Sequence, residues 1–499
     1  MKYVIGVDLG TSAVKVLLVN QEGVVVDQVS RPYPLIQEKA GYSEQNPEEW
    51  ITQTVEALKQ LVERFSEDPS AIEGLSFSGQ MHGLVLLDYK RNVLRNAILW
   101  NDTRTTRQCQ DIYAKVGKDR YIDITKNLAL EGFTLPKLLW VKENEPDIYQ
   151  QAEVFLLPKD YVRYRLTNQI HMDYSDAAGT GLLDISAKTW SSEICGRLNI
   201  DSSLCPPLIE SHEFVGTLSG SVAEQTGLSP KTKVFAGGAD NACGAIGSGI
   251  LEEGKTLCSI GTSGVVLSYE EDGSKDYQGK VHFFNHGKEG AFYSMGVTLA
   301  AGYSLNWFKE TFAHEEEFEN LLADLSDVPA GANGLLFTPY IVGERTPHTD
   351  ALIRGSFIGM DSSHKRAHFV RAVVEGITFS LKESIEMFRK NGKNVDSIIS
   401  IGGGAKNRNW LQIQADIFQA DIVKLASEQG PGMGAAMLAA YGLGWFKSLS
   451  ECASQFIQTE EVIHPNPEQA ERYKGLFSIY QKIYKQTKDL NEQLAPFRQ

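Results

Sequence analysis

Two stretches of the sequence decide the fold: YVIGVDLGTSAVKVLLV at residues 3–19 and KTLCSIGTSGVVLSY at residues 255–269. Each consists of two strand-like apolar runs joined by a turn that contains glycine, threonine and serine. Such a turn exposes backbone N–H groups and hydroxyls that can hold phosphate, and its glycine lets a ligand approach the backbone closely. Two copies, one in each half of the chain, indicate two related domains that bind one polyphosphate between them.

The two turns supply the first candidate site residues. Asp8 lies just before the first turn and offers a carboxylate that could hold Mg²⁺. A single turn of this composition is more often an ordinary hairpin, but the repetition of the same three residue types makes that explanation weak. We therefore predict an ATP site whose phosphates contact the residues of both turns: Thr11, Ser12, Gly261, Thr262 and Ser263.

Length and composition limit the class of protein. At 499 residues the chain is too long for one ordinary hydrophobic core, so at least two domains are expected. The net charge of −15 argues against nucleic acid or an anionic membrane as the main partner, although a local group of N–H donors can still bind ATP. The six cysteines form no C-x-x-C pair, and we find neither a signal peptide nor an apolar run long enough to span a bilayer. These features predict a cytoplasmic protein.

The order of predicted elements is that of an actin-like domain. After three strands near residues 3–30, a helix begins at Asn46-Pro47 and a fourth strand follows at residues 72–76. A second set begins near Lys255, and helices are expected at about 365–390, 407–420, 433–445 and 465–490. We predict an α/β protein of two actin-like (ribonuclease-H-like) ATPase domains, residues 1–242 and 243–499, with a cleft between them.

Two apparent nucleotide motifs are rejected because of their surroundings. Residues 249–256 fit the P-loop pattern letter for letter, but the residues that follow are strand-like and a P-loop requires a helix there. Residues 430–435 faintly resemble a dinucleotide fingerprint, but the spacing of the glycines is degenerate. We interpret this second segment as small residues that let a helix pack closely on a strand.

Asp240 is the predicted proton acceptor. Phosphoryl transfer to a hydroxyl group needs the phosphates and metal in position and a carboxylate that takes the hydroxyl proton. Asp240 follows a predicted strand at residues 233–235, is surrounded by small residues, and lies where we expect the two halves to meet. Taken alone, this residue could equally be an aspartate that caps a turn.

Polar loops after other predicted strands are candidates for binding a polyol and a nucleotide. Gln80, Met81 and His82 lie between two glycines and offer hydrogen bonds and a soft apolar contact to a sugar. Residues 100–104 place a tryptophan beside several polar groups, as sugar sites often do. Residues 402–404 form a triple glycine after a strand and could let an adenine ring lie against the backbone.

At these residues the chain resembles the FGGY carbohydrate kinases over essentially its whole length. The two signature regions of that family are recognisable at residues 132–144 and 355–376. Within the family, the segments SGQMHG, ILWNDTR, GGADNACGAIG, IGTSGV and GERTPH are most similar to the kinases that act on D-xylulose.

The resemblance implies ATP-dependent phosphorylation of D-xylulose at O5, which yields D-xylulose 5-phosphate and ADP in the cleft between the domains. It implies that Asp240 is the proton acceptor and that Asp8 acts through Mg²⁺. It implies that Met81, His82 and Asn241 bind the sugar. It also implies that the adenosine part of ATP contacts four residues: Gly403, Gly404, Asn407 and Trp307. A homodimer is a further expectation that comes from the family alone.

Alternative functions remain open from the sequence. A kinase for glycerol, L-ribulose or gluconate would share the fold and the base, although the segment at residues 80–82 favours D-xylulose. An actin-like ATPase that forms filaments or binds unfolded chains would share both hairpins but would need no proton acceptor for a sugar hydroxyl. A catalytically inactive sugar-binding regulator is disfavoured because Asp8 and Asp240 are both present.

Overall fold

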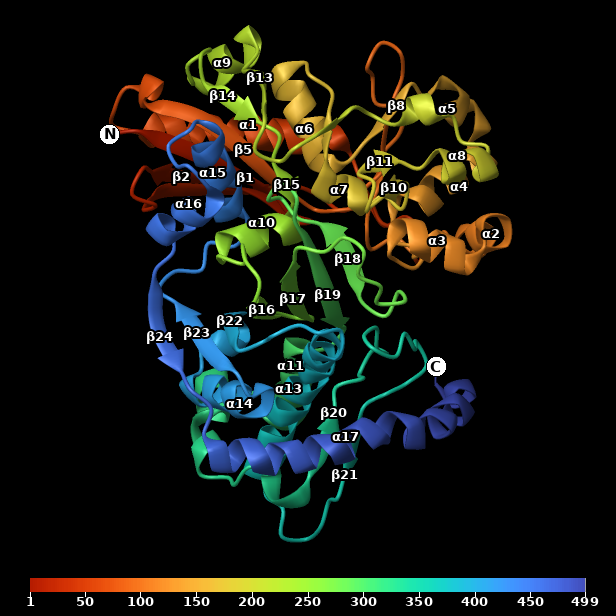
Figure 1. Cartoon of the computed structure of the whole chain (residues 1–499), viewed down its shortest axis with the longest axis vertical. Helices are drawn as coiled ribbons and strands as arrows, with labels where there is room; N and C mark the ends of the chain where they lie inside the picture. Colours follow the sequence, from red (N-terminus) through yellow and green to blue (C-terminus); the bar gives the residue numbers. More distant parts are fainter. Residues whose placement is uncertain (499) are drawn as a thin grey trace.

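In the computed structural model, which describes residues 1–498, two large β-sheets lie one above the other along the long axis of the molecule (Figure 1). In the first sheet, β1 (Tyr3–Leu9), β2 (Ala13–Asn20) and β3 (Val25–Pro32) form an antiparallel meander. β5 (Ile72–Gly79) runs parallel to β1 on its other side. β14 (Lys233–Phe235), β13 (Phe214–Thr217) and the short β15 (Gly238–Ala239) complete this sheet.

The second sheet repeats the arrangement of the first. β16 (Lys255–Ile260), β17 (Gly264–Glu270) and β19 (Phe292–Thr298) form an antiparallel meander, and β22 (Ser397–Gly402) runs parallel to β16. β18 (His282–Asn285) lies beside β19 at one edge, and β23 (Asp421–Leu425) and β24 (Thr459–Ile463) lie at the other. The two hairpins quoted above are therefore equivalent elements of two similar sheets, as the repeat in the sequence predicts.

Helices cover the sheets and form a separate lobe beside the first one. The predicted helix at residue 47 is α1 (Pro47–Arg64), and the Asn46 side chain caps it by accepting a hydrogen bond from the backbone N–H of Glu48 at 3.1 Å. The lobe at the upper right of Figure 1 carries α2 (Thr106–Val116), α3 (Lys118–Thr125), α4 (Thr134–Asn144), α5 (Pro146–Gln151) and α8 (Ser192–Leu198). α6 (Pro158–Thr167) and α7 (Tyr174–Ala178) lie between this lobe and the first sheet. Sequence reasoning predicted none of these lobe helices.

The second half carries the remaining long helices. They are α11 (Gly302–Phe312), α13 (Arg366–Lys390), α14 (Arg408–Phe418), α15 (Pro431–Gly442), α16 (Leu449–Phe456) and α17 (Pro467–Leu494). Four of them, α13, α14, α15 and α17, confirm predicted helices, with bounds that shift by a few residues. Among residues 1–498, none of the helices combines the length and apolar character that crossing a membrane requires.

The chain crosses between the halves near α10 (Asp240–Gly247), and α15 returns from the second half to pack on α10 and β1. These contacts are very close. A Cβ atom at Gly6 would lie 2.0 Å from the carbonyl oxygen of Gly432, and one at Gly434 would lie 1.9 Å from that of Cys243. Since α15 packs on the first sheet, we keep the division at residues 242 and 243 as a proposal.

The structure confirms the rejection of the P-loop motif and the interpretation of the second segment as small residues in close packing. The residues after Gly254 form strand β16 rather than the helix that a P-loop requires. Gly432 and Gly434 lie at the start of α15, where they allow the close packing on β1 and α10.

The close packing of α15 on α10 yields a stability prediction. Gly434→Ala should lower the free energy of unfolding by about 1–3 kcal/mol, because the added methyl group forces the two helices apart. Gly475→Ala is the matched control: this exposed position on α17 has open space around it, and alanine should stabilise the helix by up to about 1 kcal/mol. Urea unfolding of the three proteins measures both effects, and equal midpoints would show that the helices tolerate a methyl group between them.

Candidate active site

A cavity of about 400 Å³ lies where the two halves face each other, and it contains the predicted base. Asp240 lines this cavity together with three other predicted residues from the first half and from the crossing: Met81, His82 and Asn241. The second half contributes Ser263, one of the turn residues. The structure therefore brings together, from distant parts of the chain, five of the residues that the sequence singled out.

Asp240 is the first residue of α10, and its carboxylate accepts a hydrogen bond from the backbone N–H of Asn241 at 2.7 Å. Loss of hydration raises the pKa of Asp240 to about 7, and the negative charge of Asp8 acts in the same direction. A carboxylate whose pKa lies near neutral pH is well matched to the role of a general base, because it is both deprotonated and basic.

Asp8 lies on β1 opposite Ser78 of β5. Burial raises the pKa of Asp8, while the charge of Lys15 partly opposes that shift. Within residues 1–498, Asp8 forms no ion pair. Two dehydrated carboxylates, Asp8 and Asp240, thus interact while neither forms a direct ion pair within residues 1–498. Oxygen donors in such a setting fit a hard divalent cation such as Mg²⁺.

His82 is held as a neutral hydrogen-bond acceptor. Its Nδ1 atom lies 2.6 Å from the carbonyl oxygen of Gly179, which can only accept, so Nδ1 carries the proton and Nε2 is free to accept. Burial, helped by the charge of Lys137, lowers the pKa of His82 to about 3. The imidazole ring stacks on Phe133 with 4.5 Å between the ring centroids, which fixes its orientation.

Gln80 does not reach this cavity. Its side chain is buried and donates from Nε2 to Oε1 of Gln45 at 3.1 Å. Gln45 in turn donates to the backbone carbonyl of Thr11 at 2.6 Å. Gln80 therefore lies behind the first turn and supports it, whereas Met81 and Asn241 line the cavity and contact each other, with 3.4 Å between Nδ2 of Asn241 and Sδ of Met81.

A second cavity, of about 810 Å³, lies in the second half. Five residues predicted for ATP line it: Gly261, Thr262, Gly403, Gly404 and Asn407. Trp307 does not line it, because its ring packs parallel to Phe337. The same helix, α11, instead presents Tyr303 and Asn306 to the cavity. Spacing along the sequence could not decide which residues of an unpredicted helix face inward.

The second hairpin turn separates the two cavities. Gly261 and Thr262 line the larger cavity, and the next residue, Ser263, lines the one that contains Asp240. The start of α11 holds this turn in place, since the backbone N–H groups of Gly302 and Tyr303 donate to the carbonyls of Gly261 and Thr262 at 2.9 and 3.0 Å. A group that extends from one cavity into the other must pass this turn.

The first turn borders the smaller cavity without lining it. Oγ1 of Thr11 accepts a hydrogen bond from the indole of Trp100 at 2.9 Å, and Trp100 itself lines the cavity. Ser12 accepts at its backbone oxygen from the N–H of Tyr33 at 3.2 Å. Their contact with phosphate therefore stays a prediction.

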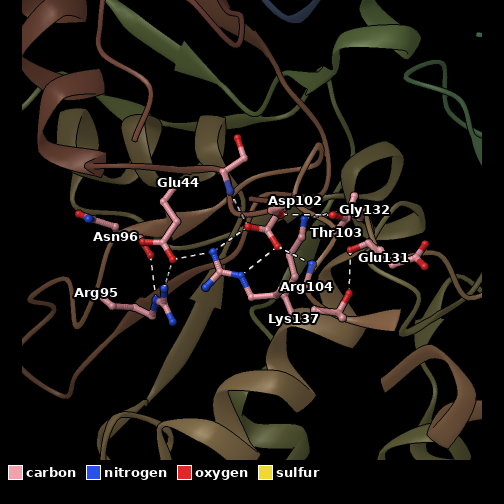
Figure 2. Close-up of polar contacts among 12 residues, drawn as sticks. Glu44, Arg95, Asn96, Asp102, Thr103, Arg104, Glu131, Gly132 and Lys137 are labelled. Atoms are coloured by element: carbon pink, nitrogen blue, oxygen red, sulfur yellow. Dashed lines mark hydrogen bonds and ion pairs between the residues drawn. The ribbon is translucent and has the colours of Figure 1, made fainter. Parts of the chain in front are cut away.

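A network of charges lies behind the loop at residues 100–104 (Figure 2). Asp102 accepts hydrogen bonds from Nε of Arg104 at 2.9 Å and from the backbone N–H of Ser43 at 2.6 Å. Arg104 also pairs with Glu44 at 2.8 Å. The polar groups of Asp102 and Arg104 are thus used to hold the loop, and the loop also places Trp100, Asn101 and Thr103 in the lining of the cavity.

Sequence reasoning missed several cavity residues. Phe133, His282, Phe284 and Arg345 line the smaller cavity, and the last three come from the second half. Burial lowers the pKa of His282 to about 3, so this histidine is neutral as well. Arg345 lies in the segment GERTPH, which marked the family resemblance but gave no sign that this residue would line the cavity that contains Asp240.

Three buried carboxylates close to the base form a structural cluster. Asp160, Asp173 and Asp176 surround the ammonium group of Lys159 at 2.7, 2.7 and 2.9 Å. The ammonium group occupies the position that a metal ion would need, so the cluster is an ion-pair network rather than a metal site.

Comparisons with known proteins agree with this geometry. Residues 3–247 match the N-terminal domain of the FGGY family of carbohydrate kinases, and residues 256–443 match its C-terminal domain. The chain therefore belongs to the FGGY family of carbohydrate kinases. This finding confirms the resemblance noted in the sequence and, with the solved structures below, the predicted actin-like fold.

The most similar relatives include xylulose kinases. The chain is 64% identical to the xylulose kinase of Bacillus subtilis (strain 168) over 498 residues, which cover 100% of both chains. The crystal structure of ligand-bound xylulose kinase from Lactobacillus acidophilus superposes with a TM-score of 0.93 at 30% identity, covering 98% of each chain. Gluconate kinase from Lactobacillus acidophilus superposes equally well, with a TM-score of 0.93 at 30% identity over 97% of this chain and 98% of that one.

The raised pKa of Asp240 predicts how activity depends on pH. A base acts when deprotonated, so kcat/KM for the sugar should be constant above about pH 7 and fall about tenfold per pH unit below it. His82→Gln is the control, because the neutral histidine does not titrate in this range. In that variant, the decrease in kcat/KM should begin at the same pH as in the wild-type protein. A profile that stays flat down to pH 5 would contradict the raised pKa of the base.

Proposed function

We propose that the protein is an ATP-dependent xylulose kinase, which transfers the γ-phosphoryl group of ATP to O5 of D-xylulose. The observation that carries this proposal is the turn at residues 261–263, which lies between a cavity with a candidate base and a cavity lined by glycines. A sugar hydroxyl beside Asp240 and an adenosine beside Gly403 and Gly404 would place the phosphates at the turn.

The identity of the sugar rests on sequence similarity. A xylulose kinase and a gluconate kinase superpose on this chain with the same TM-score, so the fold alone does not distinguish the two sugars. The 64% identity to a xylulose kinase along the whole chain favours D-xylulose. A kinase for L-ribulose, glycerol or gluconate is the alternative within the same chemistry, and an ATPase that uses no sugar is less well supported because it would leave Asp240 and its cavity without a role.

In the proposed mechanism, the residues of the smaller cavity orient the sugar and accept one proton. Nε2 of His82 accepts a hydrogen bond from a sugar hydroxyl, Asn241 offers donors and an acceptor, and Met81 contacts the carbon chain. As O5 bonds to the γ-phosphorus, the bond from that phosphorus to the bridging oxygen of ADP breaks, and the O5 proton passes to Asp240. Hydroxyl and N–H groups of the turn residues, among them Thr262 and Ser263, contact the phosphates.

Mg²⁺ belongs to the same proposal, and Asp8 is the residue that would hold it, directly or through water. When bound, the ion would neutralise part of the phosphate charge during transfer. Its charge would also relieve the repulsion between Asp8 and Asp240. The support for this assignment is the pair of dehydrated carboxylates described above.

We also propose that the protein acts in the cytoplasm. The six cysteines are free thiols, which fits a reducing compartment, and ATP is the second substrate. A homodimer is proposed from the family resemblance alone, and light scattering of the purified protein would test it.

The function is tested by ADP release with Mg-ATP and each of D-xylulose, L-ribulose, glycerol, gluconate or no sugar. We expect D-xylulose to stimulate release at least 100-fold more, in kcat/KM, than any of the other compounds, because a site built to bond specific hydroxyls rejects analogues that leave its groups unpaired. Stimulation by another compound would replace the sugar assignment. Equal rates with and without every sugar would contradict the proposed kinase activity.

Replacement of the base should separate catalysis from nucleotide binding. Asp240→Ala should lower kcat by about 10²–10⁴-fold, because no group remains to accept the O5 proton. The dissociation constant for ATP, measured by calorimetry, should change less than about threefold, because the adenosine cavity is separate from Asp240. Asp361→Ala removes an exposed aspartate that lines neither cavity and serves as the control. Near-normal turnover by Asp240→Ala would exclude Asp240 as the base.

A further inference from the structure

Lys137, on the first turns of α4, is a buried lysine without a carboxylate partner. Its side chain is fully buried, and no carboxylate of residues 1–498 lies within ion-pair distance of Nζ. Burial lowers its pKa well below the usual range, although the charge of Asp102 acts in the opposite direction. Lys159 and Lys393, which are also buried, each pair with carboxylates instead. Since burial of an unpaired lysine is unfavourable, the burial of Lys137 must be offset by contacts other than an ion pair.

The only hydrogen bonds that Lys137 forms within residues 1–498 go to two backbone carbonyls. Nζ donates to the carbonyl oxygen of His82 at 2.9 Å and to that of Gly132 at 2.6 Å. Both residues line the cavity that contains Asp240. They come from different segments of the chain, one directly after β5 and the other directly before α4. The amino group of a single lysine therefore joins two walls of this cavity.

The backbone at His82 requires such support. Its φ angle is +69°, in the left-handed region that residues other than glycine seldom adopt. The carbonyl that this conformation exposes accepts a second hydrogen bond, from Oγ1 of Thr134 at 3.1 Å. Thr134 and Lys137 are three residues apart on α4 and therefore lie on the same face of the helix. The two hydrogen bonds from this helix face hold the backbone of His82 and thereby the position of its imidazole ring.

The second carbonyl belongs to a loop that packs tightly on another cavity wall. A Cβ atom at Gly132 would lie 2.5 Å from the carbonyl oxygen of Trp100, so the two loops touch through their backbones. Figure 2 shows Lys137 beside Gly132, with the ion pair of Asp102 and Arg104 next to them. The guanidinium of Arg104 stacks on Trp140, which is also on α4, at 4.8 Å from the ring centroid. α4 thus holds three cavity segments from behind.

We propose that Lys137 is a positioning residue for sugar binding: its side-chain amino group ties the backbone of His82 to that of Gly132 and so sets the geometry of the sugar cavity without touching the substrate. This inference rests on the proposed function, because it assigns sugar binding to the cavity that contains Asp240. The nucleotide cavity shares no lining residue with the segments that Lys137 joins. A defect at Lys137 should therefore affect the two substrates differently.

The test compares two substitutions of similar length. Lys137→Met fills much of the same space but offers no donor, whereas Lys137→Gln keeps an N–H group that can still reach a carbonyl. We expect Lys137→Met to raise KM for D-xylulose at least tenfold while KM for ATP changes less than twofold. Lys137→Gln should recover part of that loss. Thermal unfolding of each variant, followed by circular dichroism, verifies that the protein is folded.

Lys382 provides the matched control. It is another buried lysine, its Nζ donates to a single backbone carbonyl, that of Ile417 at 2.6 Å, and it lines neither cavity. Lys382→Met should lower the unfolding temperature without changing either KM. A merely structural role of Lys137 would give the same result as this control, namely lower stability with KM for D-xylulose unchanged, and that outcome would overturn the proposal.

Two further measurements keep the inference open to refutation. The first is a double-mutant comparison of Lys137→Met and His82→Ala. If Lys137 acts through His82, the fold-increase in KM for D-xylulose in the double variant should be smaller than the product of the two single fold-increases. A fold-increase equal to that product would contradict an effect of Lys137 through His82. If Lys137→Met fails to fold, Thr134→Val removes only the second hydrogen bond to the His82 carbonyl and should raise KM for the sugar at least threefold. An unchanged KM in that variant would count against the role of this helix face.

A wrong assignment of the sugar can be distinguished from a wrong role of Lys137 by measurements on the wild-type protein. If the wild-type protein uses a sugar other than D-xylulose, the same variants are measured with that sugar, and the expected split between sugar and ATP is unchanged. If the wild-type protein releases ADP at the same rate without any sugar, the proposed function and the role of Lys137 are both overturned.

Discussion

The interaction on which the rest of the site depends is the repulsion between two carboxylates that have lost much of their water. Asp8 and Asp240 come from opposite ends of the first half of the chain, and the charge of Asp8 adds to burial in raising the pKa of Asp240. The fold maintains this unfavourable pair because the strands and helices that carry it are fixed by close packing. In the proposed function, the pair supplies a base of near-neutral pKa and a place for a divalent cation, which are two requirements of phosphoryl transfer.

Close backbone contacts are what hold this pair together. α10, which begins with Asp240, packs against α15 through Gly434, and α15 packs against β1, which carries Asp8, through Gly432 and Gly6. A third element fixes the residue before the base: the N–H of Ala239 donates to Oγ of Ser175 at 2.9 Å. Because backbone atoms touch directly, there is little freedom for the two carboxylates to move apart.

The fold and the centre of the site could be predicted because their signals are local. Alternating apolar residues and a glycine-containing turn predict each hairpin. The small residues around Asp240 in the sequence indicate it as a candidate base. Side-chain direction was not predictable in the same way. Gln80 is next to Met81 in sequence but points to Gln45 behind the first turn, and Trp307 packs on Phe337 while its helix presents Tyr303 to the larger cavity.

The sequence by itself determined that the chain is a duplicated α/β protein of the FGGY family with two similar glycine-containing turns and a candidate base, because periodicity and motifs are properties of neighbouring residues. Only the tertiary structure decided which distant residues share a cavity, as with Arg345 and His282 of the second half, which line the same space as His82. It also decided that a lysine of α4 supports that histidine. Such contacts depend on how the halves and the lobe pack, and that packing has no signature in the spacing of residues along the chain.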